Sequence, residues 1–260
     1  MAHKCAYCGK KNKLTKEHIW PRCIIKRVSN YNARFSERAG KFFEAELTIS
    51  DVCEECNNGV LSKLDDYICE MYDKYFQHFH QKGDSVSFNY DFDKLARWLL
   101  KISYNTARTT GIDSKLLETY VPYILGIGQC PEDTFSVRVE LIVPFQVADI
   151  QNNLVTVKEL LPTSVRSCRA QFEGIDISWC AIRLVAINSF YFWLIFIPRN
   201  VVVDQREINS VVNLLPNNIL YPECSNIVIN AGTKNAVEMH RDWFERKIKE
   251  VKEFSRKTRK

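Results

Sequence analysis

Two CxxC pairs near the start of the chain have the residue type and the spacing of metal ligands. Cys5 and Cys8 form the first pair, and Cys53 and Cys56 form the second after an interval of 44 residues. Two residues between cysteines let both sulfurs of one turn reach a single ion at about 2.3 Å, and two such pairs complete a closed tetrahedral site. The spacing therefore predicts a structural Zn²⁺, with four free thiols or a redox pair as the alternative.

A second group of residues has the chemistry needed to hydrolyse a phosphodiester bond. Glu17 and His18 lie between the two cysteine pairs, and Asn57 directly follows the second pair. An imidazole, with an ordinary pKa of about 6.5, can accept a proton from water. Carboxylate and amide oxygens are the ligands that Mg²⁺ and Mn²⁺ prefer. The alternative is a surface acid beside a packed or exposed histidine.

Taken together, residues 5–66 resemble the CxxC-flanked subgroup of the HNH endonucleases, also called ββα-metal or His-Me finger nucleases. The resemblance rests on Glu17, His18 and Pro21, and on Asn57 directly after the last cysteine. It implies that the first three lie at the end of a first strand and that Asn57 opens a helix. It also implies that His18 is the general base and that Glu17 and Asn57 hold one catalytic Mg²⁺ or Mn²⁺.

The chain departs from the family pattern in two places. The central Asn of the family is not evident on the expected second strand, where Thr48 or Ser50 lies. The family often has His where this chain has Asn57. Farther along, Asn58 could cap the helix, and we expect Asp65 and Asp66 to lie on a solvated helix face rather than at the metal.

The elements that must position these residues follow from apolar periodicity. Three- and four-residue spacing predicts helices over residues 60–81 and 92–110, and period-two stretches predict antiparallel strands over 137–143, 177–187 and 190–197. Asn235 and Glu238 are placed to form the capping pair of a last helix from Ala236. The expected fold class is α+β, with a zinc-stabilised ββα module and its following helix in residues 1–82, and an α+β domain of unknown role in residues 83–260.

The helix expected over residues 92–110 has a row of basic side chains on one side. The row contains Lys94, Arg97, Lys101 and Arg108. Such a row is well suited to a phosphate backbone, so we expect these four residues to bind nucleic acid. A solvated amphipathic helix without a ligand is the alternative.

Charge is concentrated at the two ends of a chain whose net charge is +5. Residues 1–27 carry eight Lys and Arg against one Glu, and residues 241–260 carry nine against four acids. Segregated positive charge indicates a polyanionic partner, because each cation facing a phosphate releases a counterion. For the terminal tail, added solubility is an equal alternative.

Composition excludes a membrane protein. Hydrophobic residues make up 46% of the chain, and its longest apolar stretch, residues 189–198, is about half the roughly 20 residues that a membrane span needs. The lysine-rich first residues lack the apolar core of a secretory signal, so we expect a cytoplasmic protein. In that reducing compartment disulfides are the less expected use of its 10 cysteines. We expect the six outside the CxxC pairs to be small buried side chains: Cys23, Cys69, Cys130, Cys168, Cys180 and Cys224.

These observations lead to one main functional expectation and two alternatives. The first is a metal-dependent endonuclease acting on DNA, in keeping with prokaryotic anti-phage defence or restriction. The alternatives are an HNH nuclease that cleaves structured RNA, and a zinc module that binds nucleic acid or protein without cleaving. A free nuclease would endanger its host, so we expect control by a ligand, a homodimer or a regulatory partner such as an ATPase.

Overall fold

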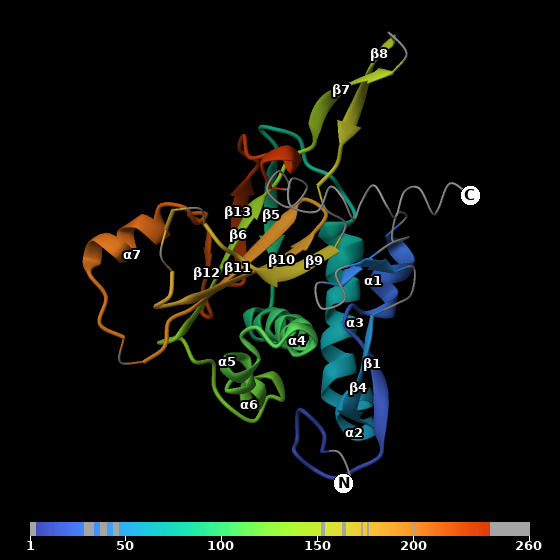
Figure 1. Ribbon diagram of the computed structural model, residues 1–260, viewed down its shortest axis with the longest axis vertical. Coiled ribbons are helices and arrows are strands. Elements are labelled where there is room, and N and C mark those ends of the chain that lie inside the picture. Colours follow the sequence, from blue (N-terminus) through green and yellow to red (C-terminus); the bar gives the residue numbers. More distant parts are fainter. Residues whose placement is uncertain are drawn as a thin grey trace.

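The computed structural model describes residues 4–28, 34–36, 41–43, 47–151, 154–162, 165–172, 174–175, 177–199 and 201–239. The basic tail, residues 241–260, lies outside the described residues. The fold is mixed α+β, built from helices and antiparallel sheets (Figure 1). This agrees with the expected fold class.

The N-terminal unit is an antiparallel strand pair followed by a helical segment. β1 (Leu14–His18) pairs with β4 (Thr48–Cys53), and the register shifts once between Thr15 and Glu17. The polar segment between these strands contains α1 (Arg22–Arg27), β2 (Arg34–Ser36) and β3 (Lys41–Phe43). After β4 the chain is helical through α2 (Glu54–Cys56), η1 (Asn57–Leu61), α3 (Ser62–Met71) and η2 (Tyr72–Phe76).

A long helix, α4 (Phe92–Thr110), follows the strand β5 (Ser85–Asn89) and packs against α3. Its ends have clear local causes. The Asp91 side chain accepts a hydrogen bond from the Lys94 backbone N–H, which satisfies one of the first free N–H groups of the helix. Gly111 ends the helix in the left-handed region at φ 81°, which glycine adopts without steric cost. Two short helices follow, α5 (Ser114–Glu118) and α6 (Val121–Ile124).

A five-stranded antiparallel sheet forms the second half of the molecule. Its strand order is β12 (Ile219–Leu220), β6 (Phe135–Leu141), β11 (Phe190–Phe196), β10 (Ala181–Ile187) and β9 (Val165–Arg169). The hairpin of β7 (Phe145–Gln151) and β8 (Leu154–Leu160) projects from one end of the molecule (Figure 1). The remaining elements are α7 (Gln205–Val212) and β13 (Asn226–Asn230), which pairs with β5.

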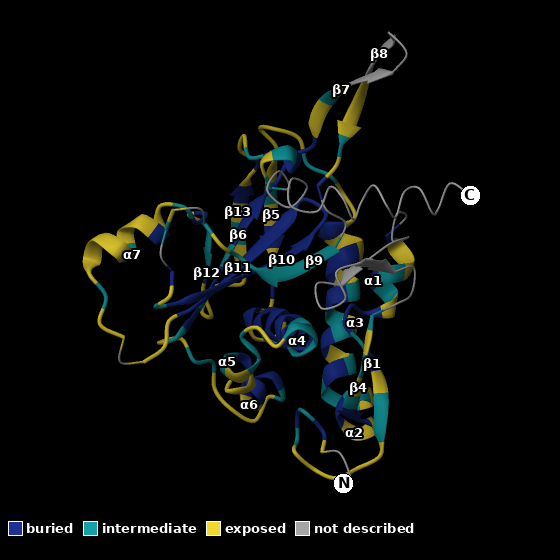
Figure 2. Ribbon diagram, in the orientation of Figure 1, coloured by how far each residue is buried: buried dark blue, intermediate teal, exposed yellow. Residues whose placement is uncertain are grey.

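Both faces of this sheet are covered, and every residue of β10 and β11 is buried (Figure 2). One face packs into a large hydrophobic core that also contains Trp98 of α4 and Ile68 of α3. The opposite face forms a smaller core that includes Trp193. The larger core extends from Cys5 to Ala231, so apolar packing is continuous across the boundary expected between residues 82 and 83.

Most of the expected elements agree with the structure. The helical run predicted over residues 60–81 begins earlier, at Glu54, and ends at Phe76. The helix predicted over residues 92–110 has these same ends, and the predicted strands correspond to β6, β10 and β11. The capping pair is confirmed, because the Asn235 amide donates to Glu238 at 3.0 Å and its carbonyl oxygen accepts from the Val237 backbone. Among the described residues, no helix is long and apolar enough to cross a membrane.

One expectation about the cysteines is wrong. Cys23 of α1 and Cys69 of α3 form a disulfide, although the sequence gave no pairing signal for them. The bond joins the segment between the two strands to the helix after them. Of the remaining four cysteines outside the CxxC pairs, only Cys180 is buried, and Cys224 is exposed.

Candidate metal centre and active site

The four cysteines of the CxxC pairs meet in one cluster. The sulfurs of Cys5, Cys8, Cys53 and Cys56 all lie within 4.8 Å of one another, and those of Cys8 and Cys53 are 3.6 Å apart. Cys53 is the last residue of β4 and Cys56 ends α2. The cluster therefore lies where β4 ends and the helical segment begins. The two knuckles can therefore hold one metal ion, as their spacing predicted.

Backbone N–H groups point at the sulfur of Cys5. Those of Tyr7 and Cys53 donate to it at 3.4 and 3.3 Å. Burial acts to raise the pKa of the Cys5 thiol, but these backbone donors favour the thiolate and bring the pKa down to about 7. Burial raises the pKa of Cys53 and of Cys56. A bound metal would keep such thiols deprotonated.

The first knuckle is fastened to α4 through Tyr7. The Tyr7 hydroxyl donates to the side chain of Asn105 at 2.6 Å. The Arg108 guanidinium lies over the rings of Tyr7 and Tyr104, at 5.2 and 4.6 Å from their centroids, and pairs with Asp51 at 2.6 Å. This helix is therefore part of the support of the cysteine cluster.

Asn57 connects the helical segment to β1. Its amide nitrogen donates to the Thr15 hydroxyl at 3.0 Å and to the Lys16 carbonyl at 3.2 Å. The helical run begins three residues before Asn57, at Glu54, so Asn57 does not open it as expected. Gly59 interrupts this run with non-helical backbone angles, and Asn58 makes no capping hydrogen bond. Asn57 thus lies against the strand that ends in Glu17 and His18.

Glu17 is buried and bound to a lysine. Only 5% of the residue is exposed, and its Oε1 lies 2.7 Å from the Nζ of Lys101 on α4. The same ammonium lies 2.7 Å from both carboxylate oxygens of Asp65 on α3, which also accepts from the Trp98 indole. Burial lowers the pKa of Lys101, but the two carboxylates outweigh it and hold the pKa above its usual value. Lys101 is therefore a charged, buried ammonium.

His18 and Glu17 lie on opposite sides of β1, as adjacent residues of a strand do. Glu17 is buried against the helices, whereas His18 is half-buried and lies opposite the exposed Thr48 of β4. Lys16, which is exposed, precedes them on the same side as His18. The outer face of the strand pair therefore presents an imidazole and an ammonium.

No family model, curated protein or solved structure matches the chain. The functional argument therefore depends on the residues described above.

The side-chain oxygens of Glu17 and Asn57, near β1, are of the type that binds a hard divalent cation. Both N–H groups of the Asn57 amide face β1, which leaves its carbonyl oxygen as a ligand atom. Glu17 supplies a carboxylate, but Lys101 already neutralises one of its oxygens. Among the described residues, the cysteine cluster is the only group of three or more His, Cys, Asp or Glu side chains close enough to share one ion. The oxygen donors fit Mg²⁺ or Mn²⁺ in type, and Lys101 opposes such an ion at Glu17.

The expected row of nucleic-acid-binding cations on α4 is corrected by the structure. Lys101 is fully buried, and the side chains of Arg97 and Arg108 are only 16% and 11% exposed. Arg97 donates to the Ile124 carbonyl and pairs with Asp93. Lys94 alone of the four is largely open, at 54%, and it pairs with Asp91. The helix is enclosed on several sides, so its basic side chains serve internal contacts.

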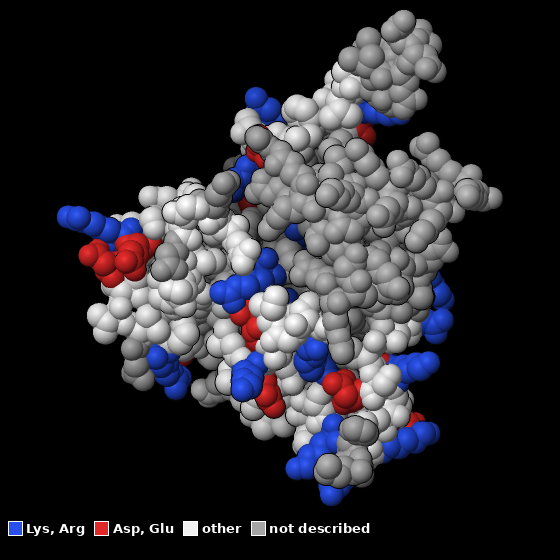
Figure 3. Space-filling model, in the orientation of Figure 1, with Lys and Arg blue, Asp and Glu red and all other residues white. Residues whose placement is uncertain are grey.

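Basic side chains gather elsewhere, around the two strands of the N-terminal unit. Figure 3 shows Lys and Arg side chains over the lower end of the molecule, where Figure 1 places β1, β4 and α2. The exposed lysines of this segment are Lys4, Lys10, Lys11, Lys13 and Lys16. Two of them form long ion pairs, Lys10 with Glu55 at 3.6 Å and Lys13 with Glu54 at 3.5 Å. Solvent-exposed pairs of this kind contribute little, so a phosphate can replace the carboxylate.

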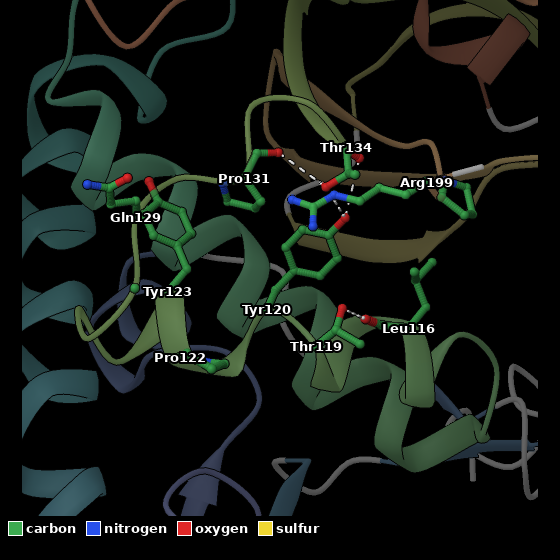
Figure 4. Close-up of a pocket in the computed structure, with 11 residues that line it drawn as sticks. Leu116, Thr119, Tyr120, Pro122, Tyr123, Gln129, Pro131, Thr134 and Arg199 are labelled. Carbon is green, nitrogen blue, oxygen red and sulfur yellow. Dashed lines mark hydrogen bonds between the residues drawn. The ribbon is translucent and has the colours of Figure 1, made fainter. Parts of the chain in front are cut away.

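Two surface hollows lie beside the short helices. The first, of about 380 Å³, lies between α5, α6 and the ends of β6 and β11 (Figure 4). The Tyr120 hydroxyl in this hollow contacts Thr134, and the Arg199 guanidinium pairs with Asp133 beside it. The second hollow, of about 530 Å³, lies against the first knuckle. Neither is lined by Glu17, His18 or Asn57.

The charged partners of Glu17 and Lys101 were not predicted from the sequence. Asp65 was expected on a solvated face, but it is the partner of Lys101 and Trp98. One signal was present: Lys101 lies between Leu100 and Ile102 within the most apolar stretch of its helix, and both neighbours are fully buried. A lysine in such a stretch is buried only when it is paired.

Proposed function

We propose that this protein is a metal-dependent nuclease of the HNH type, in which a structural Zn²⁺ fixes a ββα unit. One arrangement carries the proposal. The cysteine cluster brings the first knuckle to the end of β4 and the start of the helical segment, and Asn57 reaches from that segment to the strand carrying Glu17 and His18. Residues far apart in the sequence thereby meet in the order strand, strand and helix that the resemblance implies.

The cysteine cluster has the character of a structural zinc site. Four sulfurs complete a tetrahedral shell and leave no position for substrate, so the ion stabilises the fold and takes no part in the reaction. The ion would link the first knuckle, which precedes β1, to the second, which lies at the end of β4. The hydrolytic reaction is therefore assigned to Glu17 and His18, at the end of β1 away from the cluster.

In the proposed reaction His18 removes a proton from the attacking water, and the outer face of the strand pair receives the phosphate. Lys16 lies on that face and adds positive charge where negative charge grows. Asn57 and Glu17 are the residues that would hold a Mg²⁺ or Mn²⁺. Because Glu17 and His18 lie on opposite sides of β1, the end of that strand must turn for both to serve one phosphate. When bound, such an ion acts as a Lewis acid that stabilises the phosphate oxygens and the leaving group.

The substrate proposed is DNA, because exposed lysines surround β1 and α2. A basic surface of this kind binds the sugar-phosphate backbone without reading its sequence. The same surface accommodates structured RNA, so RNA cleavage is an outcome of the test rather than a separate site.

The test is incubation of the zinc-loaded protein with plasmid DNA and with tRNA, in Mg²⁺, in Mn²⁺ and in EDTA. We expect metal-dependent nicking of the plasmid and a loss of about 100-fold or more in His18→Ala, since general base catalysis contributes roughly that much. His78→Ala is the matched control, because His78 is exposed and lies outside the N-terminal unit's strands. Cleavage that survives His18→Ala rejects the mechanism. Cleavage of tRNA without cleavage of the plasmid would show that the substrate is RNA and not DNA.

A second candidate function is nucleic acid binding without cleavage, and the Glu17–Lys101 ion pair favours it. A carboxylate that is buried and neutralised is a poor ligand for a hydrated ion. This function predicts full binding of duplex DNA, no cleavage in any metal, and no effect of Glu17→Gln or Asn57→Ala on the affinity for DNA. Gel-shift titrations of these variants distinguish the two functions.

A further inference from the structure

Lys101 occupies an unusual position between two acidic side chains. It is fully buried in the middle of α4, and its ammonium lies 2.7 Å from Glu17 on β1 and 2.7 Å from Asp65 on α3. One cation therefore holds carboxylates from two elements of the ββα unit, although it belongs to a helix outside that unit. With two acids and one ammonium, the cluster has a charge of −1.

The position of the ammonium is fixed by its helix. The residues on either side of Lys101, Leu100 and Ile102, are completely buried in the core. The helix cannot turn Lys101 toward solvent without exposing them. Glu17, by contrast, lies at the end of a strand and keeps a small exposed fraction. Any change in this ion pair must therefore come from Glu17.

An ammonium and a divalent cation compete for the same carboxylate oxygen. Mg²⁺ and Mn²⁺ need an accessible oxygen and retain several waters, which the burial of Glu17 and the contact of its Oε1 with Lys101 together do not allow. Residues that hydrogen-bond to a metal ligand typically change the affinity for the metal by about 10- to 100-fold. Metal binding at Glu17 therefore costs the free energy of the Glu17–Lys101 ion pair, which lowers the affinity for the metal.

We propose that Lys101 is a positioning residue that controls access of the divalent metal to Glu17. In the structure the Lys101 ammonium neutralises the Glu17 carboxylate. Metal binding therefore requires the Glu17 side chain to break this ion pair. This inference rests on the proposed function, because that function assigns the metal to Glu17. It adds that the metal affinity of the site is set from α4, outside the ββα unit.

The experiment measures Mn²⁺ binding to the full-length, zinc-loaded protein by electron paramagnetic resonance, without nucleic acid. The informative variant is the double substitution Asp65→Asn with Lys101→Met. It frees Glu17 and keeps the cluster at −1, so general electrostatics are unchanged. We expect this variant to bind one Mn²⁺ at least about 10-fold more tightly than the natural protein. Adding Glu17→Gln should abolish the gain.

Two controls separate this effect from a change in folding. Lys94→Met removes an exposed lysine from the same helix and should leave Mn²⁺ affinity unchanged. Zinc content and circular dichroism identify any variant that has not folded, and Lys101→Arg, which keeps a cation at this position, should bind Mn²⁺ as weakly as the natural protein. If the folded double variant binds Mn²⁺ no more tightly than the natural protein, the inference is overturned.

Failure of this inference and failure of the proposed function have different signatures. Should no nucleic acid be cleaved while freeing Glu17 raises the Mn²⁺ affinity, the function fails and the role of Lys101 stands. If the natural protein cleaves DNA and the double variant shows no gain in Mn²⁺ affinity, the role of Lys101 fails and the function stands.

Discussion

The ββα unit and the five-stranded sheet share one apolar core, to which the unit adds a set of polar links. Around the sheet, aromatic rings interlock in that core, with the centroids of Phe76 and Phe190 4.9 Å apart. The ββα unit contributes Trp20 and Leu61 to the same core and adds four clustered sulfurs, the Asn57 contacts with β1, and the Glu17–Lys101 ion pair. Buried apolar area therefore stabilises both regions, whereas the geometry of the candidate site depends on a few specific contacts.

Helix α4 lies between these two regions and takes part in both kinds of packing. It contacts β9 and β10 of the sheet and α3 of the ββα unit. Leu99 and Ile102 belong to the apolar core, while Lys101 and Arg108 reach Glu17 and Asp51. The shared apolar core thereby positions the polar contacts of the unit. A site built from few polar contacts requires such a rigid support outside itself.

Removing a cysteine of the cluster should have the largest effect, and it should be confined to one region. We expect Cys53→Ser to lose its metal, because a structural Zn²⁺ in a small module contributes on the order of 10 kcal/mol to folding. Hydrogen exchange should then become fast in residues 4–28 and 47–61 and stay slow in β10 and β11. Metal analysis and hydrogen-exchange mass spectrometry measure both effects.

Cys180→Ser is the control for this prediction, since Cys180 is buried in the sheet region and lies outside the cluster. It should retain the full metal content. An unchanged metal content in Cys53→Ser would show that the four sulfurs do not form a metal site.

A core substitution in the sheet should have a smaller effect that does not depend on metal. Phe192 is fully buried between Phe76, Phe88 and Phe190. Truncation to Ala should lower the free energy of unfolding by about 3–5 kcal/mol, through lost burial and the cavity left behind. Denaturant titration should give the same loss with and without a zinc chelator. A loss that disappears with the chelator would show that the two regions unfold as one unit.

The disulfide between α1 and α3 should give the smallest of the three effects. It closes a loop between residues 46 apart in the sequence, and disulfides of ordinary size contribute about 2–4 kcal/mol. We expect Cys23→Ser to lower the stability of the ββα unit by this amount under oxidising conditions only. Alkylation and intact mass before and after dithiothreitol show whether the bond is present. Equal melting temperatures of the variant and the oxidised protein would contradict a stabilising role.

Much of the fold could be predicted from local patterns. Apolar periodicity located α4 and the strands β6, β10 and β11, because amphipathic spacing directly reflects which side of an element is buried. The CxxC spacing located the four cysteines that cluster and could hold one metal ion. The catalytic roles of Glu17, His18 and Asn57 remain predictions.

Local patterns could not show which charged residues would be buried. The basic side of α4 has the same appearance in sequence whether it faces water or another element, and the short helices and the first knuckle enclose it. Lys101 and Asp65 are separated by 36 residues, and Cys23 and Cys69 by 46. No local rule connects such pairs.

The sequence by itself determined the helix α4, the strands β6, β10 and β11, and the two CxxC knuckles that could share a metal ion, because these depend on residues close in the chain. Only the tertiary structure decided that Glu17 meets a lysine instead of solvent and that Arg108 lies between two tyrosine rings. The physical reason is that the state of a charged group depends on its surroundings in space. Those surroundings come from segments that the chain brings together only when it folds.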